Sequence, residues 1–114
     1  MNDGAPPVSS PMLVVLCTCP PDQANRIAKV LVEQRVAACV NVTPSVQSIY
    51  RWQNELQKEE EALLLIKTSE AVWPALEKTL QQLHPYEVPE IIALPVARAA
   101  TSYQRWVEEN LCTD

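Results

Sequence analysis

Residues 38–67 constrain the fold of this chain most strongly, because they predict two long strands joined by a two-residue turn. Even positions in the first half of this segment are mostly apolar or aromatic and odd positions are mostly polar, which is the period of a half-buried strand. Pro44 interrupts the alternation, so we expect a bend or bulge there. Gln53 and Asn54 predict the turn, since asparagine tolerates a left-handed backbone. The returning strand is polar at first and apolar from Ala62 onward.

Segments with helical periodicity alternate with strands on both sides of this hairpin. Residues 12–18 are a short apolar run that predicts a buried strand, and the segment after it carries the apolar stripe of an amphipathic helix. A second helical stripe ends near Leu83, and residues 88–97 predict a further strand. Thr101 and Gln104 have the spacing of a capping box, which predicts a last helix.

This order of elements predicts the α+β class and, within it, a ferredoxin-like βαββαβ sandwich with a long central hairpin and a C-terminal helix. A chain of 114 residues suits one domain of this kind. Residues 1–11 contain three prolines and are expected to form a flexible N-terminal tail. Residues 12–114 are expected to form the single domain.

The predicted hairpin is longer than the domain that carries it. Its arms have about fourteen residues at ~3.3 Å each, so they reach about 46 Å, roughly twice the length of the first strand. The outer half, roughly residues 46–61, should therefore project beyond the sheet with apolar side chains and unpaired edges. Such edges need cover, and a second copy of the same chain supplies it most simply. We therefore expect a homo-oligomer.

Composition excludes several classes of function. The formal net charge of −5 disfavours nucleic acid and anionic membrane surfaces as partners. The only glycine is Gly4, so glycine-rich phosphate loops are excluded. No segment approaches the ~18 apolar residues of a membrane span. No basic residue precedes the early apolar run, which argues against a signal peptide, so we expect a cytoplasmic protein with four free thiols.

His84 is the only histidine, and it lies at the end of a predicted helix against Pro85. It is either a structural corner residue or a metal ligand or proton carrier. The topology places it near Cys17, at one edge of the sheet, and a thiolate with an imidazole suits copper or zinc. Cys19 should point the same way as Cys17, whereas Cys39 begins the second strand at the opposite end. No arrangement resembles a catalytic triad, so we do not expect an enzyme.

Other charged residues allow more than one interpretation. Lys67 and Glu90 fall on neighbouring parts of the predicted sheet, where they could line a pocket or form a surface ion pair. The run Glu59, Glu60 and Glu61 is interpreted as a solvated strand face.

Three segments together resemble the CutA family of divalent-cation-tolerance proteins: "VLCTCPPDQANRIAKVLVEQRVAACVNV", "SIYRWQNELQKEEEALLLIKT" and "HPYEVPEIIALPV". The resemblance extends from about Leu13 to Leu111. It implies a ferredoxin-like fold, a tight homotrimer similar in architecture to the PII signalling proteins, a cytoplasmic location and a role in tolerance of copper and other divalent metals.

Two positions depart from the family pattern. Asn54 stands where members usually carry glycine. Leu83 stands where members with a proposed copper site carry the first of two histidines, while Cys17 and His84 match. The resemblance therefore implies weak copper binding through Cys17 and His84, with the remaining ligands from Cys19, water or another subunit.

Three functions remain open at this point. The first is a metal-binding protein in copper homeostasis, and the second is a PII-like sensor of a small ligand. The third is a trimeric scaffold for partner proteins. A ligand pocket or subunit interface is expected at these residues: Tyr50, Trp52, Lys67, Tyr86 and Glu90.

Overall fold

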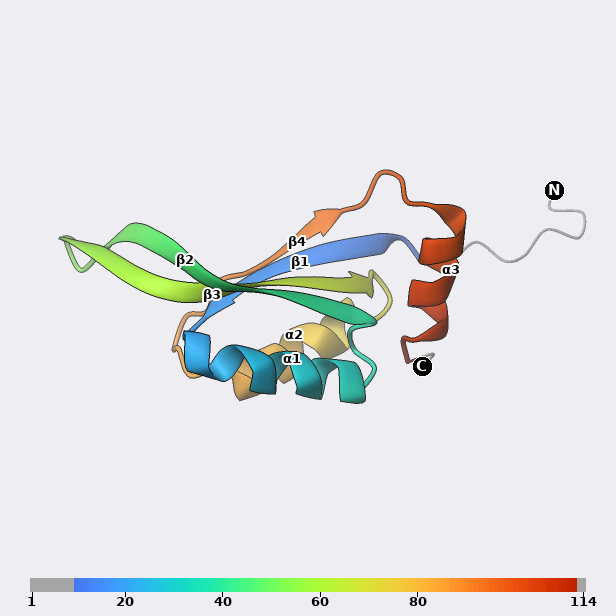
Figure 1. Cartoon of the computed structure of the whole chain (residues 1–114), viewed down its shortest axis with the longest axis horizontal. Coiled ribbons are helices and arrows are strands. Elements are labelled where there is room, and N and C mark those ends of the chain that lie inside the picture. The colour runs from blue at the N-terminus through green and yellow to red at the C-terminus, as the bar shows by residue number, and fades with distance from the viewer. Residues whose placement is uncertain (1–9, 113–114) are drawn as a thin grey trace, which may run out of the picture.

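The structure, a computed structural model, describes residues 10–112, which form a four-stranded sheet with two helices on one face (Figure 1). In chain order the elements are β1 (Met12–Cys19), the 3-10 turn η1 (Pro21–Gln23), α1 (Ala24–Glu33), β2 (Cys39–Trp52), β3 (Glu55–Ser69), α2 (Trp73–Leu83), β4 (Ile91–Pro95) and α3 (Thr101–Glu109). The strands lie in the order β2-β3-β1-β4, and all neighbours are antiparallel. The predicted ferredoxin-like α+β fold is therefore confirmed.

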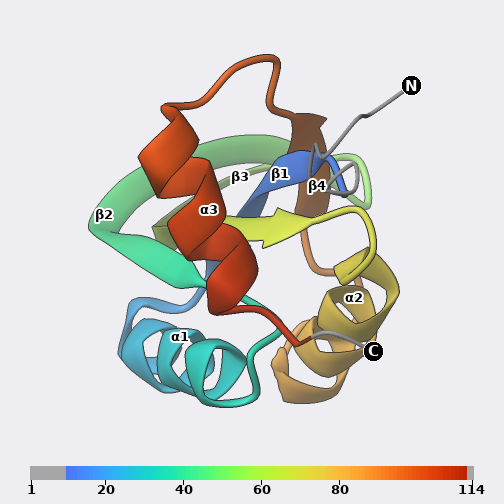
Figure 2. The same ribbon diagram turned by 90° about the vertical axis from the view of Figure 1, so that its right-hand side faces the viewer.

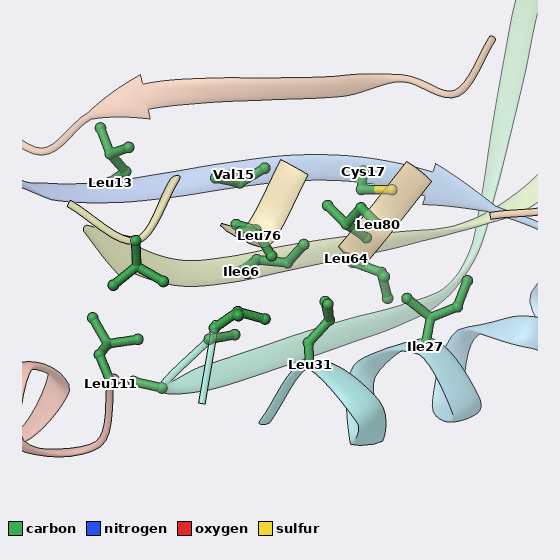
Figure 3. Close-up of a cluster of buried hydrophobic side chains, with 14 of the residues drawn as sticks. Leu13, Val15, Cys17, Ile27, Leu31, Leu64, Ile66, Leu76, Leu80 and Leu111 are labelled. Carbon is green, nitrogen blue, oxygen red and sulfur yellow. The ribbon is translucent and has the colours of Figure 1, made fainter. Parts of the chain in front are cut away.

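The hydrophobic core lies between the sheet and the helices α1 and α2 (Figure 3). Every second residue of β1 and β3 points into it, and the amphipathic stripes of the two helices close it from the other side. Its fully buried members include Val15, Cys17, Ile27, Leu31, Leu64, Ile66, Leu76 and Leu80. Full burial of each large aliphatic side chain contributes about 1.5–3 kcal/mol, so this layer dominates the stability of the domain.

Helix α3 crosses the end of the sheet that lies away from the hairpin tip (Figures 1 and 2). Val107 of this helix and Leu111, just beyond its end, are buried and belong to the core. The capping-box prediction is wrong in its position. Ala100 is the N-cap and Thr101 is already the first helical residue, so no side chain caps this helix.

The hairpin turn has the predicted geometry. Gln53 and Asn54 both have positive φ angles, 50° and 66°. Two successive left-handed residues match the right-handed twist of the flanking strands. Asparagine therefore replaces glycine at this turn without loss of the hairpin.

The strand pairing confirms an irregularity at Pro44, since the register of β2 against β3 shifts by one residue between Thr43 and Val46. Before this bulge Val42 lies opposite Leu64, on the face that the helices cover. After it Val46 lies opposite Glu61, on the other face. The even positions of β2 thus change face at the bulge, which the alternation in the sequence does not reveal.

The outer half of the hairpin projects beyond the rest of the sheet. β1 ends at Cys19, opposite Ala62, so residues 55–61 of β3 pair only with β2. The molecule measures 59 Å along this direction and 25 Å and 21 Å across it. The predicted overhang of residues 46–61 is therefore confirmed.

The face of the sheet opposite α1 and α2 is called the open face here. No described helix lies along it, although it carries half-buried or exposed aliphatic side chains: Val14, Leu16, Leu63, Leu65, Ile92 and Leu94. Their common side follows from the register, in which Leu16 lies opposite both Leu65 and Ile92.

The start of the described chain is held against the domain. The Ala71 N–H donates to Ser10 Oγ at 2.8 Å, and the Glu70 N–H donates to the Pro11 carbonyl at 2.8 Å. These two residues belong to the segment predicted as a tail. Residues 1–9 of that segment, and residues 113–114, lie outside the described residues.

Candidate functional site

His84 joins the end of α2 to the end of β1. Its Nδ1 accepts a hydrogen bond from the Tyr86 backbone N–H at 3.1 Å, and its Nε2 lies 2.7 Å from the Thr18 carbonyl oxygen. An N–H can only donate and a carbonyl can only accept, so these partners assign a neutral ring with its proton on Nε2. His84 is only 7% exposed. The structural corner role is therefore met, and both ring nitrogens are occupied.

Cys17 lies beside this corner, as the topology predicted. Its Sγ is 3.7 Å from the same Thr18 carbonyl oxygen that His84 contacts. The side chain is wholly buried and points into the core near Leu64 and Leu80 (Figure 3). Burial is the main reason that the pKa of Cys17 is raised to about 12. Burial also raises the pKa of Cys19, whose side chain points the same way.

These residues do not fit a resident copper centre in this conformation. A cysteine binds a metal as the thiolate, which burial disfavours at Cys17. A histidine ligand needs a free ring nitrogen, and His84 has none. Leu83 is half-buried against the core and offers no ligand. Within residues 10–112 no three His, Cys, Asp or Glu side chains are grouped to hold an ion. Copper binding through Cys17 and His84 stays a prediction that requires the corner to open.

The same hydrogen bonds prevent His84 from acting as a base toward Cys17. The Nε2 atom carries its proton toward Thr18, so it cannot accept a proton from the thiol. A nucleophilic cysteine needs an adjacent base with a free nitrogen. The described corner therefore lacks a cysteine–histidine dyad.

A groove of about 700 Å³ lies between the outer half of the hairpin and the chain that follows His84. It opens on the same side of the sheet as the open face, because Thr18 lies opposite Leu63. Its lining residues are Thr18, Ser48, Ile49, Tyr50, Trp52, Glu59, Glu61, Tyr86, Glu87, Val88 and Glu90. Four of the five residues predicted for a ligand pocket thus come together.

Lys67 is the fifth predicted pocket residue, and the structure places it elsewhere. It lies opposite Val14 and Cys39, toward the other end of β3. Its Nζ is 3.9 Å from Cys39 Sγ and also donates to Asn41 Oδ1. The sequence pattern placed Lys67 and Glu90 on neighbouring parts of the sheet, but β1 lies between β3 and β4, and Lys67 is near the end of β3 away from the groove.

Glu61 is the groove residue that the sequence analysis missed. It was interpreted as part of a solvated run, yet it is only 5% exposed. The Tyr86 hydroxyl donates to Glu61 Oε2 at 2.9 Å. Burial, followed by this hydrogen bond, raises the pKa of Tyr86. Glu61 adjoins Ala62, where the apolar run of β3 begins, but the sequence of the strand itself does not mark Glu61 as buried.

Tyr50 and Glu59 form a second phenol–carboxylate pair in the outer half of the groove. The Tyr50 hydroxyl donates to Glu59 Oε1, and this bond is the main reason that the pKa of Tyr50 is raised. Both tyrosines thus present aromatic rings to the groove while their hydroxyls hold carboxylates. The groove combines acidic and aromatic walls.

The fold and this groove define a ferredoxin-like protein with a projecting hairpin and a groove of acidic and aromatic walls.

The chain belongs to the CutA1 divalent ion tolerance protein family, whose family model matches residues 13–110. It is 51% identical over 98 residues to the divalent-cation tolerance protein CutA of Thermus thermophilus, covering 85% of this chain and 95% of that protein. The mouse protein CutA is 38% identical over 121 residues, which cover 96% of this chain and 68% of the mouse protein.

Solved structures agree with this assignment. The divalent cation tolerance protein of Thermus thermophilus has a TM-score of 0.86 at 49% identity, covering 89% of this chain and 99% of that chain. CutA1 from Oryza sativa has a TM-score of 0.90 at 34% identity, covering 93% of this chain and 98% of that chain. The names of both Thermus thermophilus matches refer to tolerance of divalent cations.

Among residues 10–112 no helix is long and apolar enough to cross a membrane. A solved relative from Archaeoglobus fulgidus, 28% identical to this chain and with a TM-score of 0.84 over 87% of this chain and 97% of that one, is described as periplasmic. The predicted cytoplasmic location of this chain therefore stays a prediction.

Proposed function

We propose that this chain acts in divalent-cation tolerance as a homotrimer, in which the projecting hairpin of one subunit covers the open face of the next. The proposal rests on one observation: aliphatic side chains occupy both faces of the sheet, but the helices of a protomer cover only one. An antiparallel sheet with one solvated face carries mainly polar side chains there. The open face does not follow this rule.

Exposure values support the same proposal. Ile92 and Leu94 on the open face are 48% and 45% exposed. At the hairpin tip, Trp52 and Leu56 are 49% and 72% exposed. Two apolar surfaces of this kind on one small protein are an aggregation hazard unless each covers the other in an assembly.

The arrangement of these surfaces favours a closed ring. The hairpin tip and the open face are different surfaces, so a contact between them is heterologous and must close by rotation to avoid a filament. The number three comes from the resemblance to the CutA family. A scaffold for partner proteins and a PII-like ligand sensor are compatible with the same ring.

The role in metal tolerance is proposed from the relatives, whose names refer to divalent cations. Copper is the metal that the resemblance implies. Because Cys17 and His84 are both engaged in the described conformation, we propose that any copper binding there is weak and that the fold does not depend on it. A non-enzymatic role and a cytoplasmic location complete the proposal.

Native mass spectrometry of untagged protein tests assembly and metal content together. We expect three copies of the 12.8 kDa chain and little retained copper. Ile92→Glu, on the open face, should give monomer, because it places a charge in the subunit contact. Val32→Glu is the matched control: Val32 is 42% exposed on α1, which lies on the other side of the sheet.

Three results would contradict all or part of the proposal. A stable wild-type monomer would contradict the proposed homotrimer. Equal loss of assembly in both variants would show that added charge, and not the open face, is responsible. Tightly retained copper, with loss of the fold on chelation, would overturn the weak-binding part alone.

A further inference from the structure

The acidic groove carries negative charge that its own lining residues do not balance. Four carboxylates line it, those of Glu59, Glu61, Glu87 and Glu90, and none of its lining residues is basic. Glu61 is only 5% exposed, and its described hydrogen-bond partner is the neutral hydroxyl of Tyr86. Burial of a carboxylate without a positive partner is costly, so the groove favours a cation beside Glu61.

Lys67 has the opposite imbalance on the open face of the same sheet. It lies opposite Val14, so it shares the side of the aliphatic residues there, and it is half-buried. The described contacts of its Nζ are with the thiol of Cys39 and the amide of Asn41, and neither is a carboxylate. Among residues 10–112 no other lysine or arginine of the four strands points to this side. Lys67 is therefore the cation that the open face offers.

The two charges are too far apart to meet within one protomer. Glu61 and Lys67 are six residues apart on β3, which is about 20 Å of extended strand. In the proposed ring, however, the hairpin of one subunit covers the open face of the next. A head-to-tail contact of this kind uses both surfaces of every subunit, so each groove meets a face that carries Lys67.

We propose that Lys67 of one subunit enters the acidic groove of its neighbour, with its ammonium beside Glu61 and Glu90 and its carbon chain against Tyr50 and Trp52. The walls of the groove suit this occupant, because aromatic faces attract an ammonium group and accept the aliphatic stem of a lysine. The inference rests on the proposed homotrimer and names the residue that the partner copy contributes. The groove is then a site that only two subunits together complete.

Subunit exchange measures this contact directly. Unlabelled and isotope-labelled protein are mixed, and native mass spectrometry follows the appearance of mixed assemblies. Lys67→Met keeps a long side chain but removes its charge, and Glu61→Gln keeps an acceptor for the Tyr86 hydroxyl. Each variant should exchange at least about tenfold faster than wild type, because loss of one partner of a buried ion pair acts mainly on dissociation.

The double variant identifies the pair. Substitutions about 20 Å apart in one protomer have additive effects unless the two side chains meet across subunits. Lys67→Met combined with Glu61→Gln should therefore exchange no more than about twofold faster than the faster single variant. Lys58→Met is the matched control, since Lys58 is exposed on the same strand and lies outside the groove. Its exchange rate should stay within about twofold of wild type.

Additive effects of Lys67→Met and Glu61→Gln in a protein that assembles would overturn the ion pair and leave the homotrimer intact. Equal acceleration by Lys58→Met would also overturn it, because loss of any positive charge would then have the same effect. A wild-type monomer would instead contradict the proposed homotrimer itself. If Glu61→Gln does not fold, Glu90→Gln, at an exposed position in the groove, takes its place in the same comparison.

Discussion

The two halves of the central hairpin share one backbone ladder but differ in what covers their side chains. In the inner half of β3, Leu64 and Ile66 are fully buried beneath α1 and α2. In the outer half, Leu56 is 72% exposed, although β2 and β3 remain paired to the turn. Backbone pairing therefore continues for several residues after the core has ended.

The difference shows that backbone pairing and the protomer's own core specify separate parts of the hairpin. A two-stranded ribbon without a third layer is marginal in water. The outer half nevertheless keeps aromatic and aliphatic residues, including Tyr50 and Trp52, that the protomer itself does not bury. The proposed contact with another subunit would bury these residues.

Truncation of one leucine in each half is the strongest test of this comparison. Leu64→Ala should lower the free energy of unfolding by about 3–5 kcal/mol, because it leaves a cavity in a closely packed layer. Leu56→Ala removes the same atoms from an exposed site. Its effect should appear only through assembly and should therefore depend on protein concentration, unlike that of Leu64→Ala. Urea unfolding at two protein concentrations measures both; equal, concentration-independent losses would contradict the comparison.

The thiol of Cys17, buried in β1 opposite Leu64 of the inner half, predicts a loss of stability at alkaline pH. Because the pKa of Cys17 is raised from 9.0 to about 12, the unfolded chain releases this proton at lower pH than the folded chain. The contribution is complete below pH 9 and is lost as pH rises toward 12. The slope should approach about 1.4 kcal/mol per pH unit for this one proton.

Urea unfolding between pH 9 and 10 measures the buried thiols, since Cys19, whose pKa is also raised, contributes to the same loss, and Tyr86 adds its own loss above pH 10. Cys17→Ala should reduce the slope in this window, and the double variant Cys17→Ala with Cys19→Ala should remove it. Val15→Ala, in the same strand and equally buried, should lower stability but keep the slope. An unchanged slope in Cys17→Ala would assign the alkaline loss to another group.

The smallest expected effect lies at the hairpin tip. Asn54 has a φ angle of 66°, a conformation that costs alanine about 1 kcal/mol more than glycine. Asn54→Ala should therefore lower the free energy of unfolding by about 1 kcal/mol, whereas Asn54→Gly should stay within about 0.5 kcal/mol of wild type. Thermal unfolding of the two variants side by side checks this prediction. An Asn54→Ala variant as stable as wild type would show that the turn does not need the left-handed backbone.

The fold was largely predictable because its signals are local. Alternation, the irregularity at Pro44 and the turn at Asn54 each depend on a few consecutive residues. The helix start at Thr101 was misplaced by one residue, because a hydroxyl residue can serve either as cap or as first helical residue. The position of such a boundary depends on the backbone conformation of the loop that precedes the helix.

The site was predictable only in part, because it depends on contacts between distant segments. The topology placed Cys17 near His84 correctly. It could not show that backbone groups of Thr18 and Tyr86 occupy both nitrogens of the histidine. Burial of Glu61 likewise depends on the folded position of the segment after α2, which no pattern within β3 encodes.

The bulge between Thr43 and Val46 gives the hairpin one position where its length can vary without changing the groove. Two residues of β2 lie there against one residue of β3, so loss of one of the two would give regular pairing and leave Val46 opposite Glu61. A deletion beyond Val46 would instead exchange the faces of the strand that follows, and Ile49 and Arg51 would take the places of Ser48 and Tyr50. Relatives with this fold can therefore lose the extra residue at the bulge and keep the groove, whereas a deletion nearer the tip would rebuild it.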